Sequence, residues 1–144
     1  MLWVKSFFGI LFQTALLGVF LYLPALTLNW ADALLLLSIH FLITILACAY
    51  LLIVKPASIE ARMNYDSEAQ PKEDRLASVL MLSAIVVGFS LAPIDIFHLN
   101  LSPTFEGNIK NIGLGFYFIG MFLFMASMNA NEFAETTVNI QEER

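Results

Sequence analysis

The chain has 144 residues, of which 59% are hydrophobic and only 13% are charged, about half the charged share of an ordinary soluble protein. Thirteen phenylalanines stand against seven lysines and arginines, a balance that excludes a water-exposed surface. The net charge of −5 excludes the basic footprint of a nucleic-acid-binding protein, and the single cysteine excludes an intrachain disulfide and a multi-cysteine metal site.

Four long stretches without a charged residue divide the chain. They contain 26, 22, 19 and 21 residues. A helix of about 20 apolar residues crosses the hydrocarbon core of a bilayer, and it satisfies its own backbone hydrogen bonds there. The pattern therefore predicts an all-α integral membrane protein whose partner is the lipid bilayer. Its four transmembrane helices are expected at about residues 6–28, 33–54, 76–94 and 109–130.

The first two spans contain few polar residues. The run at 6–28 is too long for a secretory signal peptide and has no convincing cleavage site, so we expect it to remain as a span. Trp30 follows it as a predicted interface anchor. In the second span, His40 lies one helical turn before Thr44. A lone histidine in this setting hydrogen-bonds to another helix more often than it binds a ligand.

The loop at 55–75 is expected on the cytoplasmic side. It carries four of the seven basic residues: Lys55, Arg62, Lys72 and Arg75. The positive-inside rule then places both termini and the tail at 131–144 in the cytoplasm as well. Within the loop, Ala57–Asn64 is predicted as a short interfacial helix with Ile59 and Met63 on its lipid side.

The loop at 95–108 is expected to be a short excursion on the outer side. His98 lies there close in sequence to Asp95, but a third ligand for a metal ion is missing nearby. A metal site is therefore not expected in this loop.

The fourth span has small residues along one side. Gly113, Gly120 and Ser127 recur at intervals of seven, and small residues let membrane helices approach closely. This pattern predicts a neighbouring helix packed against Gly120. The bulky residues of the other side are expected to face lipid: Phe116, Phe118, Phe122 and Phe124. Packing explains the stripe, so it does not indicate a site.

The tail at 131–144 is rich in β-branched residues before it ends in a cluster of charge. Such residues favour extended backbone, so we expect a short extended C-terminal segment. It could form one wall of a pocket at the membrane interface. From the residues alone a solvated tail is favoured, because termini are usually poorly ordered.

Several stretches of this sequence resemble one enzyme family. The most specific stretch is Asn131-x-Phe133 followed by Val138-x-Ile140-Gln141-x-Glu143-Arg144. Looser stretches are Leu23-Pro24-Ala25 to Asn29-Trp30, Lys55-Pro56 to Glu60-Ala61-Arg62, and Asp74-Arg75. They look like bacterial members of the isoprenylcysteine carboxyl methyltransferase family, part of a wider group that includes phospholipid methyltransferases, and the likeness extends over nearly the whole chain. The family often has an arginine where this sequence has Asn139, which argues against a contact with an anionic group there.

The resemblance implies S-adenosylmethionine-dependent methyl transfer to a lipid-linked or membrane-partitioned acceptor, in the bacterial inner (cytoplasmic) membrane. In such proteins a Gly-His follows the Glu-Arg at once, and a later Arg-His-Pro belongs to the half that holds the cofactor and the catalytic groups. Because this sequence ends at Arg144, we expect a membrane-embedded N-terminal part, truncated before that half. We expect it to have no catalytic residue, bound cofactor or metal site of its own. The residues that the resemblance connects with the cofactor site are those of the junction motif: Asn131, Phe133, Val138, Ile140, Gln141, Glu143 and Arg144.

Two other functions are compatible with the sequence. The first is a non-enzymatic four-helix membrane subunit or scaffold. The second is a small four-helix enzyme of the glutathione-using eicosanoid type. That class carries Arg, Asn and Glu on its second span, where this chain offers only His40 and Thr44, so it ranks last.

Overall fold

A computed structural model of the chain describes residues 1–63, 72–102 and 108–130. The described part is helical and contains no strand. Its elements in chain order are α1 (Leu2–Ala25), α2 (Ala31–Val54), α3 (Pro56–Met63), α4 (Lys72–Ile94), the π-helical turn η1 (Asp95–Leu99) and α5 (Asn108–Ala130). The four helices α1, α2, α4 (continued by η1) and α5 are long and apolar enough to cross a membrane, as the charge pattern predicts. The expected extended segment at 131–144 lies outside the described residues.

The helix ends differ from the predicted ones by a few residues. Helix α1 starts at Leu2, so Lys5 is part of the helix, where a long side chain can carry its charge to the interface. It ends at Ala25 because Leu26 adopts a left-handed backbone with φ 54°. Helix α4 does not stop at Ile94 but continues through η1.

The turn η1 shortens the predicted outer loop. Asn100 caps it with a left-handed φ of 50°, and its N–H donates to the Asp95 carbonyl at 2.7 Å. The Asp95 carboxylate accepts the N–H of Leu101 at 2.8 Å and that of Ser102 at 3.2 Å. These bonds satisfy backbone groups just past the helix end, so the helical turn is stable where the sequence predicted a loop.

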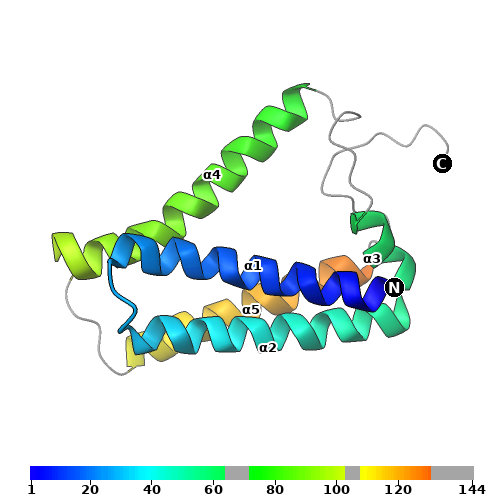
Figure 1. Ribbon diagram of the computed structural model, residues 1–144, viewed down its shortest axis with the longest axis horizontal. Helices are drawn as coiled ribbons and strands as arrows, with labels where there is room; N and C mark the ends of the chain where they lie inside the picture. The colour runs from blue at the N-terminus through cyan, green and yellow to red at the C-terminus, as the bar shows by residue number, and fades with distance from the viewer. Residues whose placement is uncertain (64–71, 103–107, 131–144) are drawn as a thin grey trace.

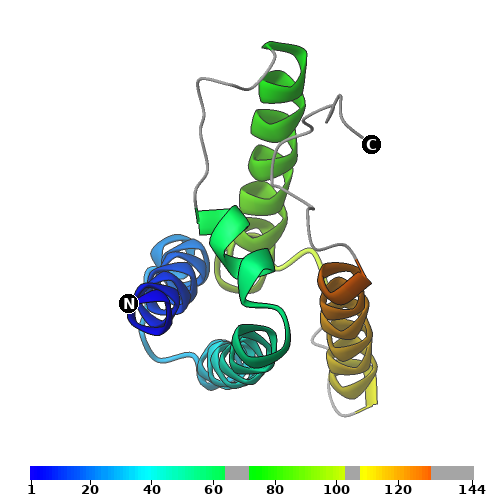
Figure 2. The ribbon, with the colours of Figure 1, turned by 90° about the vertical axis from the view of Figure 1, so that its right-hand side faces the viewer.

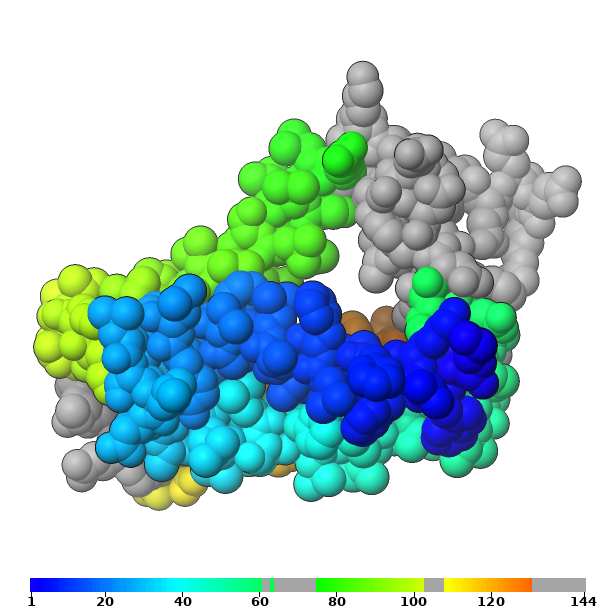
Figure 3. Space-filling view, in the orientation of Figure 1, coloured from blue at the N-terminus to red at the C-terminus, as the bar shows by residue number. Residues whose placement is uncertain are grey.

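Helices α1 and α2 form an antiparallel hairpin, and the other two long helices lie against different members of it (Figure 1). Helix α5 runs beside α2, so that α2 lies between α1 and α5 (Figure 2). The second half of α4, which leads into η1, lies against α1, whereas its first half stands clear of the hairpin (Figure 3). Most apolar side chains are exposed, which fits helices surrounded by lipid.

Buried apolar residues gather at two ends of the bundle. At the end that we call the Trp30 end, Leu17, Leu21 and Ala33 form a cluster with Trp30 packed against it. We call the other end the Lys55 end. Helix α1 begins there, α2 and α5 end there, and α3 packs on the end of α2 there. The cluster at this end consists of Leu51, Leu52 and Ile59, with Leu2, Cys48 and Met128 packed against it.

The helix α3 is present, but its predicted orientation is wrong for Ile59. This side chain is only 8% exposed and packs on the end of α2, not on the lipid side. The chain turns back at Lys55, whose carbonyl accepts the N–H of Ser58 at 3.1 Å, and the turn brings α3 over α2. Met63 is exposed, and its sulfur accepts a hydrogen bond from Ser6 at 3.7 Å.

The predicted close packing at Gly113 and Gly120 is also wrong among the described residues. A Cβ added at either glycine would meet no heavy atom within 4 Å. The half-buried side of α5 consists instead of Leu114, Tyr117, Met121, Met125 and Met128. Polar contacts with α2 turn this side toward the bundle, and the line of small residues lies about a quarter to a third of a turn away from it.

Candidate functional site

A histidine–tyrosine pair joins α2 to α5 in the middle of the spans. A hydrogen bond of 2.5 Å links His40 Nδ1 and Tyr117 Oη, and the two rings are tilted by 59°. His40 is buried, and its own carbonyl accepts the Thr44 hydroxyl at 2.7 Å. The sequence predicted His40 as a residue that hydrogen-bonds to another helix, and this prediction is confirmed. Its partner was missed, although Tyr117 is the one aromatic residue of its span with a hydroxyl, because the sequence does not show how this helix is rotated.

Besides the two bonded atoms of this pair, two polar atoms at about the same depth of the bundle are buried. His40 Nε2 and Thr14 Oγ1 have no hydrogen-bond partner among the described residues. A Cβ added to Gly18 on α1 would lie 3.5 Å from Leu37 on α2, so these two residues lie at the same depth of the bundle. Because α1 and α2 are antiparallel, Thr14, about one turn before Gly18, lies at about the depth of His40, which follows Leu37 by about one turn. Three helices thus contribute a polar group at about the same depth of the bundle. Each of these two unpaired atoms exposes less than 1 Å².

A lysine fixes the end of α5 at the Lys55 end. Lys55 Nζ donates to the Asn129 carbonyl at 2.6 Å, in the last turn of α5. A cation is favoured there because the last carbonyls of a helix lack backbone partners and carry the negative end of its dipole. Met128 packs beside it on the cluster of Leu51, Leu52 and Ile59. The chain therefore leaves α5 next to the turn between α2 and α3.

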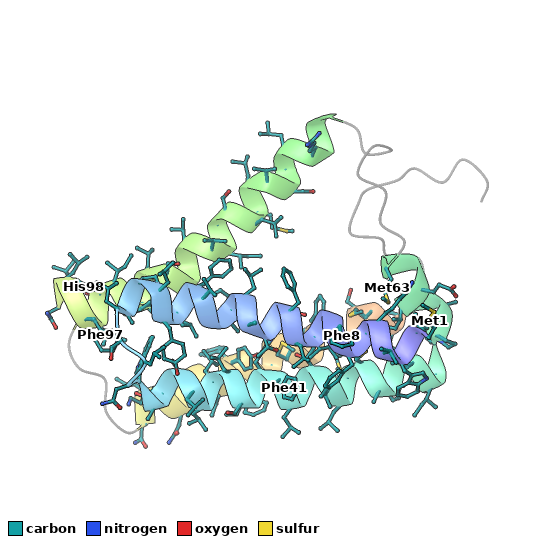
Figure 4. The ribbon with its side chains drawn as sticks, viewed as in Figure 1. Met1, Phe8, Phe41, Met63, Phe97 and His98 are labelled. Atoms are coloured by element: carbon teal, nitrogen blue, oxygen red, sulfur yellow. The ribbon has the colours of Figure 1, made fainter. Side chains whose placement is uncertain are left out.

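At the Trp30 end, the η1 turn and the loop after α1 are held together. Trp30 packs edge-to-face on Phe97, with ring centroids 5.3 Å apart. His98 Nε2 donates to the Pro24 carbonyl at 2.6 Å. Figure 4 shows Phe97 and His98 at this end of the molecule, opposite Met1 and Met63. His98 is therefore engaged with backbone, and the described residues contain no group of three potential metal ligands.

An ion pair holds the start of α5 at the same end. Lys110 Nζ lies 2.7 Å from Asp32 Oδ2, and both side chains are more than half exposed. Exposed pairs contribute little to stability. Together with His40–Tyr117 and Lys55–Asn129, this pair places polar contacts between α2 and α5 in the middle and at both ends of the described part of α5.

An apolar groove lies between the start of α1 and the end of α2. It has a volume of about 200 Å³ and is lined by Trp3, Ser6, Phe7, Ile10, Ile45, Cys48, Ala49 and Leu52. The buried Ser6, Ile10 and Leu52 form its floor, while the exposed Trp3 and Phe7 form its rim. Cys48, the single cysteine of the chain, forms part of the wall of this groove.

The residues of the predicted junction motif lie outside the described residues: Asn131, Phe133, Val138, Ile140, Gln141, Glu143 and Arg144. The structure describes only the point from which they start, at Ala130.

Comparisons of the chain with protein-family models, curated proteins and solved structures gave no match. Its function must therefore be argued from its own residues.

Proposed function

We propose that this chain is the membrane-embedded N-terminal part of a methyltransferase similar to the isoprenylcysteine carboxyl methyltransferases. The intact enzyme would transfer a methyl group from S-adenosylmethionine to a lipid-linked or membrane-partitioned acceptor. The main support is the resemblance at Asn131–Arg144, together with the looser likeness along the four spans.

One structural observation supports the same proposal. The bond from Lys55 Nζ to the Asn129 carbonyl connects one stretch that carries the resemblance to a residue just before a second such stretch. One is the stretch from Lys55 to Arg62, and the other begins one residue after Ala130. A methyltransferase of this kind must bring a soluble cofactor to an apolar acceptor at the membrane surface. Because this bond joins the turn between α2 and α3 to the end of α5, it would hold these two segments in fixed positions beside such a site.

The proposal includes an orientation. The Lys55 end would face the cytoplasm of a bacterium, because six of the seven basic residues belong to segments on that side by the positive-inside rule. The Trp30 end, with Lys110 and Asp32, would face outward across the inner membrane. This places the exit of α5 where a soluble cofactor is available.

The described residues do not fit the cofactor. The groove at the Lys55 end is lined by apolar side chains and Ser6, and the Ser6 hydroxyl is engaged with Met63. S-adenosylmethionine carries a sulfonium, an amine and a carboxylate, so it needs charged and polar partners. The spans would therefore contribute position and exclusion of water, while the cofactor would be bound elsewhere in the intact enzyme.

The test is methyl transfer by the product of a reading frame extended beyond codon 144. Membranes containing that product should transfer a labelled methyl group from S-adenosylmethionine to a synthetic prenylcysteine or to a phospholipid amine. Membranes with the 144-residue chain serve as the control and should show no transfer. Absence of transfer to either acceptor, together with a downstream sequence lacking Gly-His and Arg-His-Pro, would favour a non-enzymatic subunit instead.

A further inference from the structure

We infer that the first half of α4 closes onto α1 in a second state of the bundle, in which the Ser83 hydroxyl is hydrogen-bonded to the side-chain amide of Gln13. The structure then shows the open state, in which these two residues face lipid. This inference does not depend on the methyltransferase proposal. It rests on an unpaired polar residue in the middle of α1 and on the register between two parallel helices.

Gln13 is a polar residue exposed in the middle of a span. It lies close to the midpoint of α1, and its side chain has no hydrogen-bond partner in the described part of the chain. The hydrocarbon core of a bilayer offers no hydrogen bond to an amide, so this exposure is costly. A state in which the amide gains a partner is therefore favoured.

The register of α1 and α4 identifies that partner. Both helices run toward the Trp30 end (Figure 1), where the Ser90 hydroxyl donates to the Phe20 carbonyl at 3.4 Å. Gln13 and Ser83 each lie seven residues earlier on their helices, which is about two turns. They therefore occupy the sides of α1 and α4 that face each other at Phe20 and Ser90. If α4 continued along α1, the Ser83 hydroxyl would meet the Gln13 amide.

The same sides of the two helices also match nearer the Lys55 end. Gly9 and Val79 lie about three turns before Phe20 and Ser90. A Cβ added to Gly9 would meet no heavy atom within 4 Å, and Val79 is 52% exposed. A glycine lets membrane helices approach closely. Helix α4 of the same chain is thus the occupant for which this side of α1 has both a polar partner and room.

The second half of α4 provides a fixed point for the closure. It is held at the Trp30 end by the contact of Phe97 with Trp30 and by the bond from His98 to the Pro24 carbonyl. Figure 1 shows that α4 changes direction before it joins η1, and Pro93 lies inside this part of the helix. Proline removes an intrahelical hydrogen bond and is a usual cause of a bend. Closure therefore needs a movement of the first half of α4 alone.

Disulfide formation in native membranes tests the closure. Gly9→Cys and Val79→Cys would be combined in a chain whose own cysteine is removed by Cys48→Ala. In the open state no atom lies within 4 Å of a Cβ at Gly9, whereas the Cβ atoms of a disulfide are about 3.8 Å apart. Mild oxidation should therefore join the two cysteines within one chain only if α4 closes. A bond between two chains in place of this one would show that a second copy covers α1, and it would overturn the inference.

Two further pairs are the controls. Gly9→Cys with Leu80→Cys should react at least threefold more slowly, because Leu80 is 61% exposed and lies about 100° around α4 from Val79. Phe20→Cys with Ser90→Cys should react readily, because the helices already touch there, and it reports that the bundle is folded. Equal rates for Val79→Cys and Leu80→Cys would overturn the inference. So would the absence of a bond at Val79→Cys while the pair at Phe20 and Ser90 forms one.

Variants of the polar pair test what holds the closed state. Gln13→Leu and Ser83→Ala should each slow the reaction between Gly9→Cys and Val79→Cys by about threefold, the effect of one average hydrogen bond between membrane helices. Phe12→Leu is the matched control, because Phe12 is 70% exposed and lies about 100° around α1 from Gln13. It should leave the rate unchanged. If Gln13→Leu has no more effect than Phe12→Leu, the hydrogen bond does not hold α4 closed and the inference falls.

Discussion

Tyr117 and His40 form a polar contact between α5 and α2 in the middle of the spans. Hydrogen bonds between membrane helices are worth about 0.6 kcal/mol on average and up to about 1.7 kcal/mol. We expect Tyr117→Phe to destabilise the protein by this amount, because it leaves His40 Nδ1 as well as Nε2 without a partner. The measurement is unfolding by sodium dodecyl sulfate in mixed micelles, followed by circular dichroism.

A double variant separates the bond from the packing of the two rings. His40→Leu combined with Tyr117→Phe removes both polar partners, and replacing both by apolar groups of similar shape is often nearly neutral. The double variant should therefore be more stable than Tyr117→Phe alone. If the double variant loses as much stability as His40→Leu and Tyr117→Phe lose in sum when each is made alone, the rings pack together but the hydrogen bond contributes nothing to stability.

Residue chemistry explains what the sequence could predict about the candidate site. A histidine inside a long uncharged run must find a partner, so the interhelical role of His40 was predictable. Tyr117 was not predictable as that partner, because its position depends on how α5 is rotated. Lys55 was predicted only as a basic residue of the cytoplasmic loop and as part of a stretch that carries the resemblance. Its bond to Asn129 depends on α5 ending beside α2, which composition does not determine.

At the scale of the helices, glycines that lie in similar apolar stretches of the sequence have different surroundings in the structure. Gly18 lies against α2, where an added Cβ would be 3.5 Å from Leu37, whereas Gly120 faces open space. Gly18→Leu should destabilise the hairpin by about 1–3 kcal/mol, the usual cost of overpacking. Gly120→Leu should change stability by less than about 0.5 kcal/mol, as surface substitutions do. Thermal unfolding of the two variants in the same detergent compares them directly.

The opposite ranking would restore the prediction made from the sequence. If Gly120→Leu is the more damaging of the two, a helix packs on the line of small residues in the native assembly. Phe122→Leu is the control for α5, since Phe122 is 72% exposed and one apolar side chain there should replace another at little cost. The small-residue pattern misled because spacing identifies a face but not its neighbour.

Helix α3 shows the same limit of helix-scale reasoning. Its existence was predictable from the Lys55–Pro56 boundary and the mixed residues that follow. Its rotation was not, because Ile59 and Met63 look equally suited to lipid. The turn at Lys55 and Ser58 decides that Ile59 is buried while Met63 remains exposed.

The molecule as a whole follows from the spacing of its charges, but the arrangement of its helices does not. Four uncharged runs predict four spans because the bilayer sets their length. Lipid tails are as apolar as the helix surfaces, so no hydrophobic force selects which helices pair. The divergence of α4 from α1 could not be foreseen for this reason (Figure 1).

The 144-residue chain should not bind S-adenosylmethionine appreciably. The described groove has an apolar lining, and by resemblance the residues that hold the cofactor follow Arg144. Isothermal calorimetry of the detergent-solubilised chain should give no measurable heat of binding up to roughly millimolar cofactor, where the binding free energy is only about −4 kcal/mol. A micromolar dissociation constant would show that this chain holds a cofactor site of its own.

The orientation of the whole molecule provides the last prediction. Leu2 and Met128 pack on the same cluster, so α1 begins and α5 ends on one side of the bundle. The four-span topology assigns six of the seven basic residues to segments expected on that side, and Lys110 to the start of α5 at the other end. The positive-inside rule then predicts that this side is cytoplasmic.

Alkaline phosphatase, active only outside the cytoplasm, should be inactive when fused after Arg75 or Arg144 and active when inserted after Ser102. A green fluorescent protein at the same positions should report the reverse. Moving the charge by adding four lysines at 103–107, together with neutral replacements at Arg62, Lys72 and Arg75, should weaken or invert this pattern. Active phosphatase at Arg144 in the native sequence would contradict both the four-span topology and the cytoplasmic exit of α5 on which the proposed enzyme depends.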